Sequence, residues 1–229
     1  ELIGAKQNRV LNLSILAPAH EKISIPVSCV EQGRWSYRSS RFASSERVHF
    51  SRGRASRAER VSLEMRRAGS RRSEQHEVWD FISEKAARMN VHSSTEAMSD
   101  IFDRYKRSTQ EFITHLPTVT DQVGAVFAIR GELVGIDLFD SASTFVKLRP
   151  KLLRSYSIDA LETGTPHESR VHERDVKNLI EEMEKTKTED LPAVGLGKDC
   201  RFADEDLIGG ALVVEETVIH LCAFPRSSL

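Results

Sequence analysis

The spacing of apolar residues predicts two amphipathic helices in the middle of the chain. Between residues 78 and 86, apolar side chains recur at intervals of three or four, which places them on one face of a helix. The same spacing returns at 97–105, after hydroxyl residues at 93–95 that can cap the first turn. We expect the second helix to continue toward His115, before a proline.

Alternating or continuous apolar runs predict strands near both ends of the chain. Residues 11–16 and 23–30 are two such runs. Residues 123–139 contain two further runs on either side of Arg130-Gly131, a pair that suits a tight turn because glycine accepts a positive φ. Residues 210–224 repeat this arrangement, so both segments are predicted to be β-hairpins.

Two more helices are predicted in the second half of the chain. Asp140-Ser141 can cap a helix that carries apolar residues as far as Leu161, with Pro150 starting or kinking its second part. Residues 176–183 form another amphipathic stretch with a charged outer face.

Strands at both ends, with helices grouped between them, favour an α+β fold with a mostly antiparallel sheet. We expect terminal strands and both hairpins to contribute to this sheet. The helices around Trp79 and Phe102 are expected to cover one of its faces.

Composition agrees with a folded domain of ordinary size. The chain has 229 residues, 39% hydrophobic and 29% charged, with a net charge of -1 and a mean hydropathy of -0.38. These values are typical of globular proteins, and we expect one domain spanning residues 1–229. The longest apolar runs are far shorter than the roughly 18 residues of a membrane span, so none is expected.

Charge is distributed unevenly along the chain. Residues 34–72 contain twelve arginines, no lysine and three acids, a local charge of +9 that leaves -10 for the rest. The same region is rich in serine and poor in large apolar residues. We therefore expect an Arg-rich mobile loop or arm at about 36–73, or a lightly packed helix within it.

The cysteines bear on the cellular compartment. Cys29, Cys200 and Cys222 are too few, and odd in number, for a disulfide scaffold, which favours a reducing environment. The first residues lack the basic and apolar regions of a secretory leader, and we expect a cytoplasmic protein. No metal site is predicted, and the cofactor is left unknown.

Polar groups gather at the end of the predicted strand 23–30. Cys29 lacks the spacing to an arginine or a glycine that phosphatase and rhodanese loops use, which favours a small buried side chain over a nucleophile. Glu31 and Arg34 are close enough to bind a diol, a carboxylate or a phosphate together. A structural ion pair at the strand end is the alternative, and the sequence leaves both open.

Five motifs together resemble one known family across residues 3–225. They are Cys-x-Glu-Gln-Gly-Arg-Trp at 29–35, Gln-x-x-Val-Trp at 75–79, Gly-x-x-x-Gly-x-Asp-Leu-Phe at 131–139, Lys-Leu-Leu-x-Ser-Tyr at 151–156, and Ile-His-Leu with a later Phe at 219–224. The chain resembles the ARG and rhodanese-phosphatase-superfamily-associated protein domain. The resemblance implies a link to ADP-ribosylglycohydrolases and rhodanese-phosphatase proteins, and hence to NAD or ADP-ribose metabolism.

These motifs suggest one polar cleft. Glu31, Arg34, Gln75 and Asp137 are expected to converge there, with a carboxylate as general base and the guanidinium holding a phosphate. His220 is either a satisfied core histidine or a catalytic one. The candidate catalytic residues are Glu31 and Asp137, and the candidate ligand-binding residues are Gln32, Arg34, Trp35, Gln75 and Trp79.

Three functions are compatible with the sequence. The leading one is a small-molecule-binding domain, or an enzyme such as a hydrolase, for ADP-ribose or an NAD-derived nucleotide. The second is an Arg-rich interaction module without catalysis; a pI of about 6.8 argues against a dedicated nucleic-acid binder and leaves ADP-ribosylation-related proteins as partners. The third is a purely structural role for the named residues.

Overall fold

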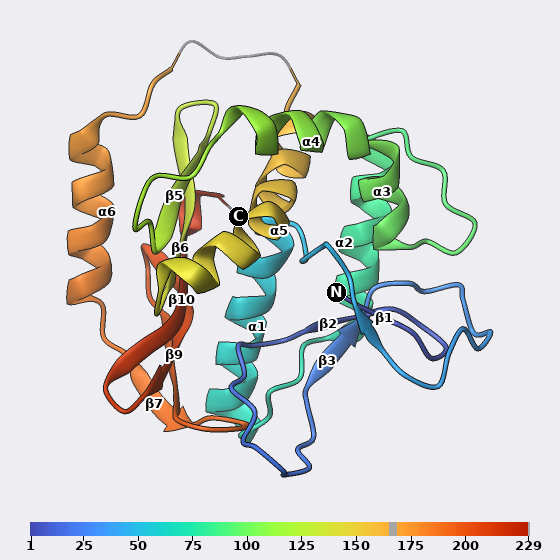
Figure 1. Ribbon diagram of the computed structural model, residues 1–229, viewed down its shortest axis with the longest axis horizontal. Helices are drawn as coiled ribbons and strands as arrows, with labels where there is room; N and C mark the ends of the chain where they lie inside the picture. Colours follow the sequence, from blue (N-terminus) through green and yellow to red (C-terminus); the bar gives the residue numbers. More distant parts are fainter. Residues whose placement is uncertain (165–168, 229) are drawn as a thin grey trace.

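The computed structural model describes residues 1–164 and 169–228, within which the strands form two antiparallel sheets (Figure 1). The large sheet contains β5 (Gly124–Ile129), β6 (Glu132–Phe139), β7 (Glu189–Pro192), β8 (Lys198–Ala203), β9 (Leu207–Val214) and β10 (Thr217–Pro225), in the order β5-β6-β10-β9-β8-β7. The small sheet contains β1 (Leu2–Ile3), β2 (Arg9–Leu11), β3 (Val27–Cys29) and β4 (Ala43–Ser44), in the order β3-β2-β1-β4.

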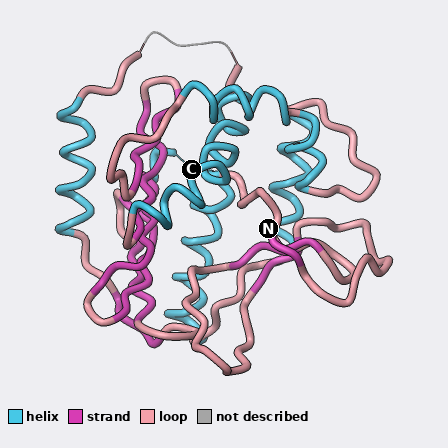
Figure 2. Tube along the Cα trace, viewed as in Figure 1, coloured by secondary structure: helices cyan, strands magenta, loops and turns pink. Residues whose placement is uncertain are grey.

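Helices lie on both faces of the large sheet. They are α1 (Ser51–Ala68), α2 (Gln75–Arg88), α3 (Met98–Arg104), α4 (Lys106–His115), α5 (Ala142–Glu162) and α6 (Glu173–Lys185), with a closing 3-10 turn at Arg226–Ser228. Figure 1 shows α6 outside one face, α1 and α5 against the other, and α2 and α3 beyond them beside the small sheet. Figure 2 separates the two groups of strands. In the described part of the chain, no helix has both the length and the apolar character to cross a membrane.

The α+β fold is as predicted, and so are both hairpins. β5 and β6 pair around Arg130 and Gly131, whose φ angles are 54° and 80°. β9 and β10 pair around Glu215 and Glu216, which also have positive φ. β6 and β10 are neighbours, so the two hairpins meet in one sheet as expected.

The predicted α5 and α6 are also confirmed. The side chain of Ser141 caps α5 by accepting a hydrogen bond from the backbone N–H of Thr144, and Pro150 lies inside the helix. Leu179 of α6 packs with apolar residues such as Phe202 on the outer face of the large sheet.

The helices that cover the inner face of the large sheet are not the expected ones. α1 contacts β8 and β9, and α5 contacts β5 and β6. Val78 and Ile82 of α2 instead pack with Phe102 of α3, Val10 of β2 and Ile158 of α5. The helices around Trp79 and Phe102 therefore form a second core between α5 and the small sheet.

Of the two alternatives expected within about 36–73, a mobile loop and a lightly packed helix, the structure contains a helix. Residues 51–68 form α1, a central helix whose buried side includes Ala55, Ala58, Val61 and Met65. Small residues along this side let the helix approach its neighbours closely. Gly53 illustrates this, because a Cβ atom there would lie 1.9 Å from Cε1 of His49. Local composition concealed a helix whose stability comes from tertiary packing.

Other boundaries moved by a few residues. The helix expected to reach His115 is divided at Tyr105 into α3 and α4. The strand expected at 11–16 is wrong beyond Leu11, because β2 lies at Arg9–Leu11, and the strand expected at 23–30 is reduced to the three residues of β3 that pair with it. Residues 186–188, which follow α6, lead into the edge strand β7.

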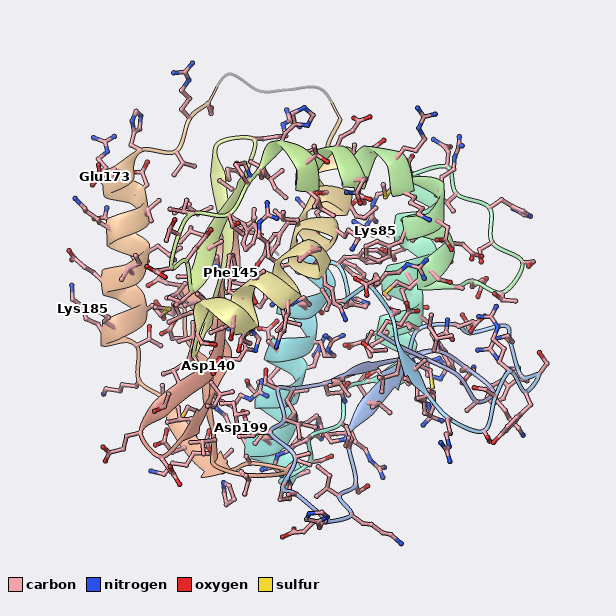
Figure 3. The ribbon with its side chains drawn as sticks, viewed as in Figure 1. Lys85, Asp140, Phe145, Glu173, Lys185 and Asp199 are labelled. Carbon is pink, nitrogen blue, oxygen red and sulfur yellow. The ribbon has the colours of Figure 1, made fainter. Side chains whose placement is uncertain are left out.

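A buried ion cluster holds three helices together. Lys85 of α2, labelled in Figure 3, is fully buried and places its Nζ 2.5 Å from Oδ1 of Asp159 on α5. It also contacts Glu162, which Arg88 holds from the solvent side. Asp159 Oδ2 accepts hydrogen bonds from the Ser51 hydroxyl and from the backbone N–H of Arg52, 3.1 Å away. The carboxylate therefore also caps the first turn of α1.

Breaking this cluster should destabilise the fold strongly. Lys85→Met would leave Asp159 buried without its cation, and we expect the free energy of unfolding to fall by about 3–5 kcal/mol. Arg88→Ala, which removes a half-exposed partner of Glu162, should cost about 1 kcal/mol or less. Urea unfolding followed by circular dichroism measures both; similar losses in the two variants would contradict the role given to Lys85.

Candidate functional site

The inner face of the large sheet is polar at its middle strands, although helices cover it. Asp137 of β6 is paired with Cys222 of β10, and His220 lies two residues away on the same face. Asp199 and Arg201 of β8 occupy this face as well, in register with the intervening β9. Covered faces are normally apolar, so a row of polar groups there indicates a functional or a strongly paired region.

Asp137 is the centre of this row. Its side chain is fully buried, and it receives hydrogen bonds from three elements. Arg54 of α1 binds both carboxylate oxygens, with Nη1 at 3.1 Å from Oδ2. The Tyr156 hydroxyl of α5 donates to Oδ2 at 3.0 Å, and Nε2 of His220 lies 3.2 Å from Oδ1.

Gly135 makes room for one of these contacts. A Cβ atom at this position would lie 2.5 Å from the Tyr156 hydroxyl oxygen. The glycine two residues before Asp137 therefore lets the tyrosine reach the carboxylate across the strand.

The surroundings keep Asp137 ionised. Burial alone would raise the pKa of its carboxyl group, but the Arg54 charge and the hydrogen bond with His220 hold that pKa below its usual value. Burial and the neighbouring carboxylate raise the pKa of Tyr156 well above its usual value, so this hydroxyl stays a donor. Asp137 is thus an anion with its donors already in place.

A cavity of about 470 Å³ lies in front of this row. Its walls come from β2 and the segment that follows it, from α1 and α5, and from the inner face of β8, β9 and β10. Its volume is within the range of small-molecule sites. Apolar side chains such as Leu13, Phe139 and Leu152 line part of it, and Asp199, labelled in Figure 3, lies on its β8 side.

Cationic groups outnumber anionic ones around the cavity. Arg54 is neutralised by Asp137, and Arg201 binds Asp199 with Nε 2.7 Å from Oδ1. Arg57 is different: only 9% of the residue is exposed, and it makes no hydrogen bond or ion pair with any described residue. Burial and the charge of Arg54 lower the pKa of Arg57 to about 10, so it remains a cation at neutral pH.

A serine from the N-terminal segment closes a hydrogen-bonded chain at the same cavity. Ser14 and His220 both line it, and the Ser14 hydroxyl oxygen lies 2.5 Å from Nδ1 of His220. The histidine ring stacks on Phe139, with ring centroids 4.5 Å apart. Its backbone follows an irregularity in the pairing of β9 with β10, a device that redirects side chains at sheet surfaces.

Glu31 and Arg34 bind each other in a different region. Oε2 of Glu31 lies 2.7 Å from Nη2 of Arg34, and both side chains are buried. The Arg34 guanidinium also donates to backbone oxygens of Ala5 and Ser36. Glu31 accepts a hydrogen bond from the backbone N–H of Asn8. These contacts fasten the loop after β3 to the segment between β1 and β2.

Gln75 has a similar role at the other side of β3. Its amide oxygen accepts from the backbone N–H of Cys29, and its amide nitrogen donates to the carbonyl of the same residue, both at 2.8 Å. The side chain of Gln75 thus pairs with the strand as a neighbouring strand would.

The remaining predicted ligand-binding residues lie outside the cavity. Trp35 is 65% exposed, Trp79 is half-buried on α2, and the backbone of Gln32 accepts a hydrogen bond from Gln7. None of these lines the cavity, nor do Glu31, Arg34 and Gln75.

The expected single cleft of Glu31, Arg34, Gln75 and Asp137 is therefore not formed. The side chains of Glu31, Arg34 and Gln75 bind groups of the small sheet and its loops. Asp137 instead binds Arg54 and His220, which line the cavity. Sequence reasoning missed Arg54, Arg57 and Ser14 altogether. The two arginines lie three residues apart on a helical face next to Ala58 and Val61, a spacing that could have placed them inward.

The fold and the cavity define an α+β domain with a partly neutralised cationic pocket. The model of one protein family, the ARG and Rhodanese-Phosphatase-superfamily-associated Protein domain, matches residues 1–224. The chain belongs to this family, as its motifs suggested. Comparisons with curated proteins and with solved structures give no match.

The two arginines of α1 should have opposite effects on stability. Arg57→Met removes a buried cation that lacks a partner, and we expect the free energy of unfolding to stay equal or to rise by about 1 kcal/mol or more. Arg54→Met leaves Asp137 buried without its cation and should cost about 3–5 kcal/mol. Urea unfolding of both variants tests this, and a large loss in Arg57→Met would show that this guanidinium has a structural partner.

His49, on the cavity wall beside Arg57, should make folding sensitive to mild acid. Burial, reinforced by the charges of Arg57 and Lys85, lowers the pKa of His49 well below its usual value of 6.5. The unfolded chain therefore takes up a proton that the folded chain refuses, and stability falls as the pH drops below about 6.5. The slope for one proton is about 1.4 kcal/mol per pH unit.

Urea unfolding between pH 7.5 and 5 measures this slope. His49→Phe, which suits a site beside Phe50 and Phe81, should flatten it, whereas His92→Phe at an exposed position should retain it. An unchanged slope in His49→Phe would show that other groups are responsible.

Proposed function

We propose that this domain binds a small anionic ligand of nucleotide type in the cavity between α1 and the large sheet. The observation that carries the proposal is Arg57, a buried cation without a partner among the described residues. Taking a charge out of water costs several kcal/mol unless an opposite charge compensates it. A ligand that brings an anion to Arg57 supplies that compensation.

The composition of the walls narrows the ligand class. A guanidinium binds phosphate and carboxylate groups through two parallel hydrogen bonds, and Lys151 adds a second positive charge at the cavity. The apolar part of the wall suits an uncharged portion such as a base or an acyl group. Phe139 and His220 line the cavity and stack on each other, whereas Trp35 and Trp79 lie outside it. This aromatic pair is therefore the surface on which a base of the ligand would stack.

ADP-ribose and NAD-derived nucleotides fit this description, with phosphates for the cation and a base for the apolar wall. Their choice rests on the family resemblance for metabolic context and on Arg57 for chemistry. Inorganic phosphate, AMP and NAD are included in the test because the phosphate group is common to all of them.

The arginine-rich surface offers less support for the interaction-module alternative. Arg60 binds Glu77 at 2.8 Å, Arg66 binds Glu189 at 3.2 Å, and Arg47 binds Asp103. These guanidinium groups are satisfied within the fold, which leaves fewer for a macromolecular phosphate backbone. A salt titration separates the two functions, because a surface interaction weakens steeply with ionic strength.

A thermal-shift screen with ADP-ribose, NAD, AMP and inorganic phosphate tests the proposal. A ligand at one hundred times its dissociation constant should stabilise the folded protein by about 2.7 kcal/mol. We expect at least one phosphate compound to do so.

The decisive variant is Arg57→Gln, which should abolish the shift. The matched control is Arg60→Gln, on the same helix but facing the solvent, which should keep it. If none of the four compounds shifts the melting temperature, or if Arg57→Gln responds like the control, the cavity is not an anion site.

A further inference from the structure

Ser14, His220 and Asp137 form a relay of hydrogen bonds that ends at the cavity. The serine oxygen lies 2.5 Å from Nδ1 of the histidine, and Nε2 of the same ring lies 3.2 Å from the carboxylate. The three residues come from the segment after β2, from β10 and from β6. A hydroxyl, an imidazole and a buried carboxylate in this order are the parts of an activated nucleophile.

The tautomer of the neutral ring follows from its neighbours. Asp137 is held as a carboxylate, which can only accept hydrogen bonds, so Nε2 of His220 must carry a proton. In the neutral ring, Nδ1 then has a free lone pair and accepts a hydrogen bond from the Ser14 hydroxyl. This is the direction in which a general base removes a proton from a nucleophile.

We infer that Ser14 is the nucleophile of a hydrolase, that His220 is its general base, and that the substrate is a carboxylic ester bearing a phosphate or carboxylate group. The choice of an anionic substrate rests on the proposed function of Arg57, whereas the nucleophile rests on the relay alone. Asp137 acts as a positioning residue: Arg54 and Tyr156 fix it, and it fixes the histidine ring.

The relay sits where a substrate would meet it. Ser14 and His220 line the same cavity as Arg57, and Leu13 and Leu152 supply apolar wall for an acyl chain. Only about a fifth of the His220 side chain is exposed, and stacking on Phe139 restrains its ring. A base whose orientation is fixed before the substrate arrives loses little entropy in the reaction.

The chemistry balances with water as the only co-reactant. The Ser14 oxygen bonds to the ester carbonyl carbon while its proton passes to Nδ1 of His220. The tetrahedral intermediate collapses, the ester C–O bond breaks, and the departing alcohol takes the proton from His220. Water then adds to the acyl carbon and gives a proton to Nδ1 of His220. The bond between this carbon and the Ser14 oxygen breaks, and His220 returns the proton to the serine oxygen. The products are a carboxylic acid and an alcohol, without oxidation or reduction.

A fluorophosphonate probe tests the nucleophile directly. Incubation of the full chain with the probe, followed by intact mass and peptide mapping, should show one adduct on Ser14. Ser14→Ala should show none, and Ser143→Ala, at an exposed hydroxyl on α5, should label like the parent. His220→Gln, which keeps hydrogen-bonding capacity at the ring position, should label about 100-fold more slowly or worse.

Two ester substrates then test the substrate class. The substrates are 4-nitrophenyl butyrate and the mono-4-nitrophenyl ester of glutaric acid, whose acyl chains differ only in a terminal carboxylate. We expect the anionic ester to be preferred, and Arg57→Gln to lower the ratio of its kcat/KM to that of the neutral ester at least tenfold.

The outcomes keep the two proposals apart. An unlabelled Ser14, an adduct on another serine, or fast labelling of His220→Gln would overturn the nucleophile, even if the phosphate compounds still shift the melting temperature. Labelling of Ser14 without any phosphate-induced shift, and without a preference for the anionic ester, would leave the hydrolase and remove the anion site. The phosphate-induced shift of Ser14→Ala shows that this variant still forms the cavity.

Discussion

The buried carboxylate of Asp137 is the constraint on which the arrangement of the domain depends. A carboxylate taken out of water is tolerated only when donors surround it. Here the donors come from α1, α5 and β10, so one group on β6 dictates where three other elements lie. If α1, α5 or β10 were displaced, the Asp137 carboxylate would lose a donor while remaining buried. The position of α1 across the inner face of the large sheet follows from this requirement.

A second carboxylate acts on the same helix from its other side. Asp159 caps the start of α1 and binds Lys85 of α2, while Asp137 holds Arg54 one turn further along. α1 is thus held by a hydrogen-bonded cap and a buried ion pair, in addition to the packing of a side made mostly of small residues. Charged side chains are held in the conformations that their hydrogen bonds require. They therefore cannot adopt other rotamers to fill a gap, as leucine or methionine can. This explains why an open volume persists between α1 and the sheet.

The sequence allowed the regular parts of the fold to be predicted. Periodicity identified α2, α5, α6 and both hairpins because each has a strong local signal, in the case of the first hairpin a glycine at Gly131. In the region of α1 the sequence left a mobile loop and a lightly packed helix both open, because a composition of serine, glycine and arginine favours no packed helix by itself. Its partners are distant: Asp137 lies 83 positions from Arg54, and Glu189 lies 123 positions from Arg66. No local pattern reports such pairings.

The candidate site, like the fold, could be predicted from the sequence only in part. An acid in an apolar strand needs a partner when it is buried, which correctly drew attention to Asp137. The conspicuous cluster of Glu31 and Arg34 proved to be closed by its own neighbours, because residues three apart in a loop can pair with each other. Ser14 carried no signal of its own, and the helical spacing of Arg57 indicates only the side of the helix on which it lies. Their significance depends on what lies opposite them, which only the tertiary structure shows.

The distance between Ser14 and His220 along the chain has a consequence for biosynthesis. The two residues are 206 positions apart, so the ribosome adds the serine long before the histidine. Bringing together residues this far apart is entropically costly. It also requires the hairpin of β9 and β10 to have paired with β6. A chain that lacks β10 therefore contains the serine without its imidazole partner. The contact between Ser14 and His220 forms only after β10 has been synthesised and has paired with its neighbouring strands.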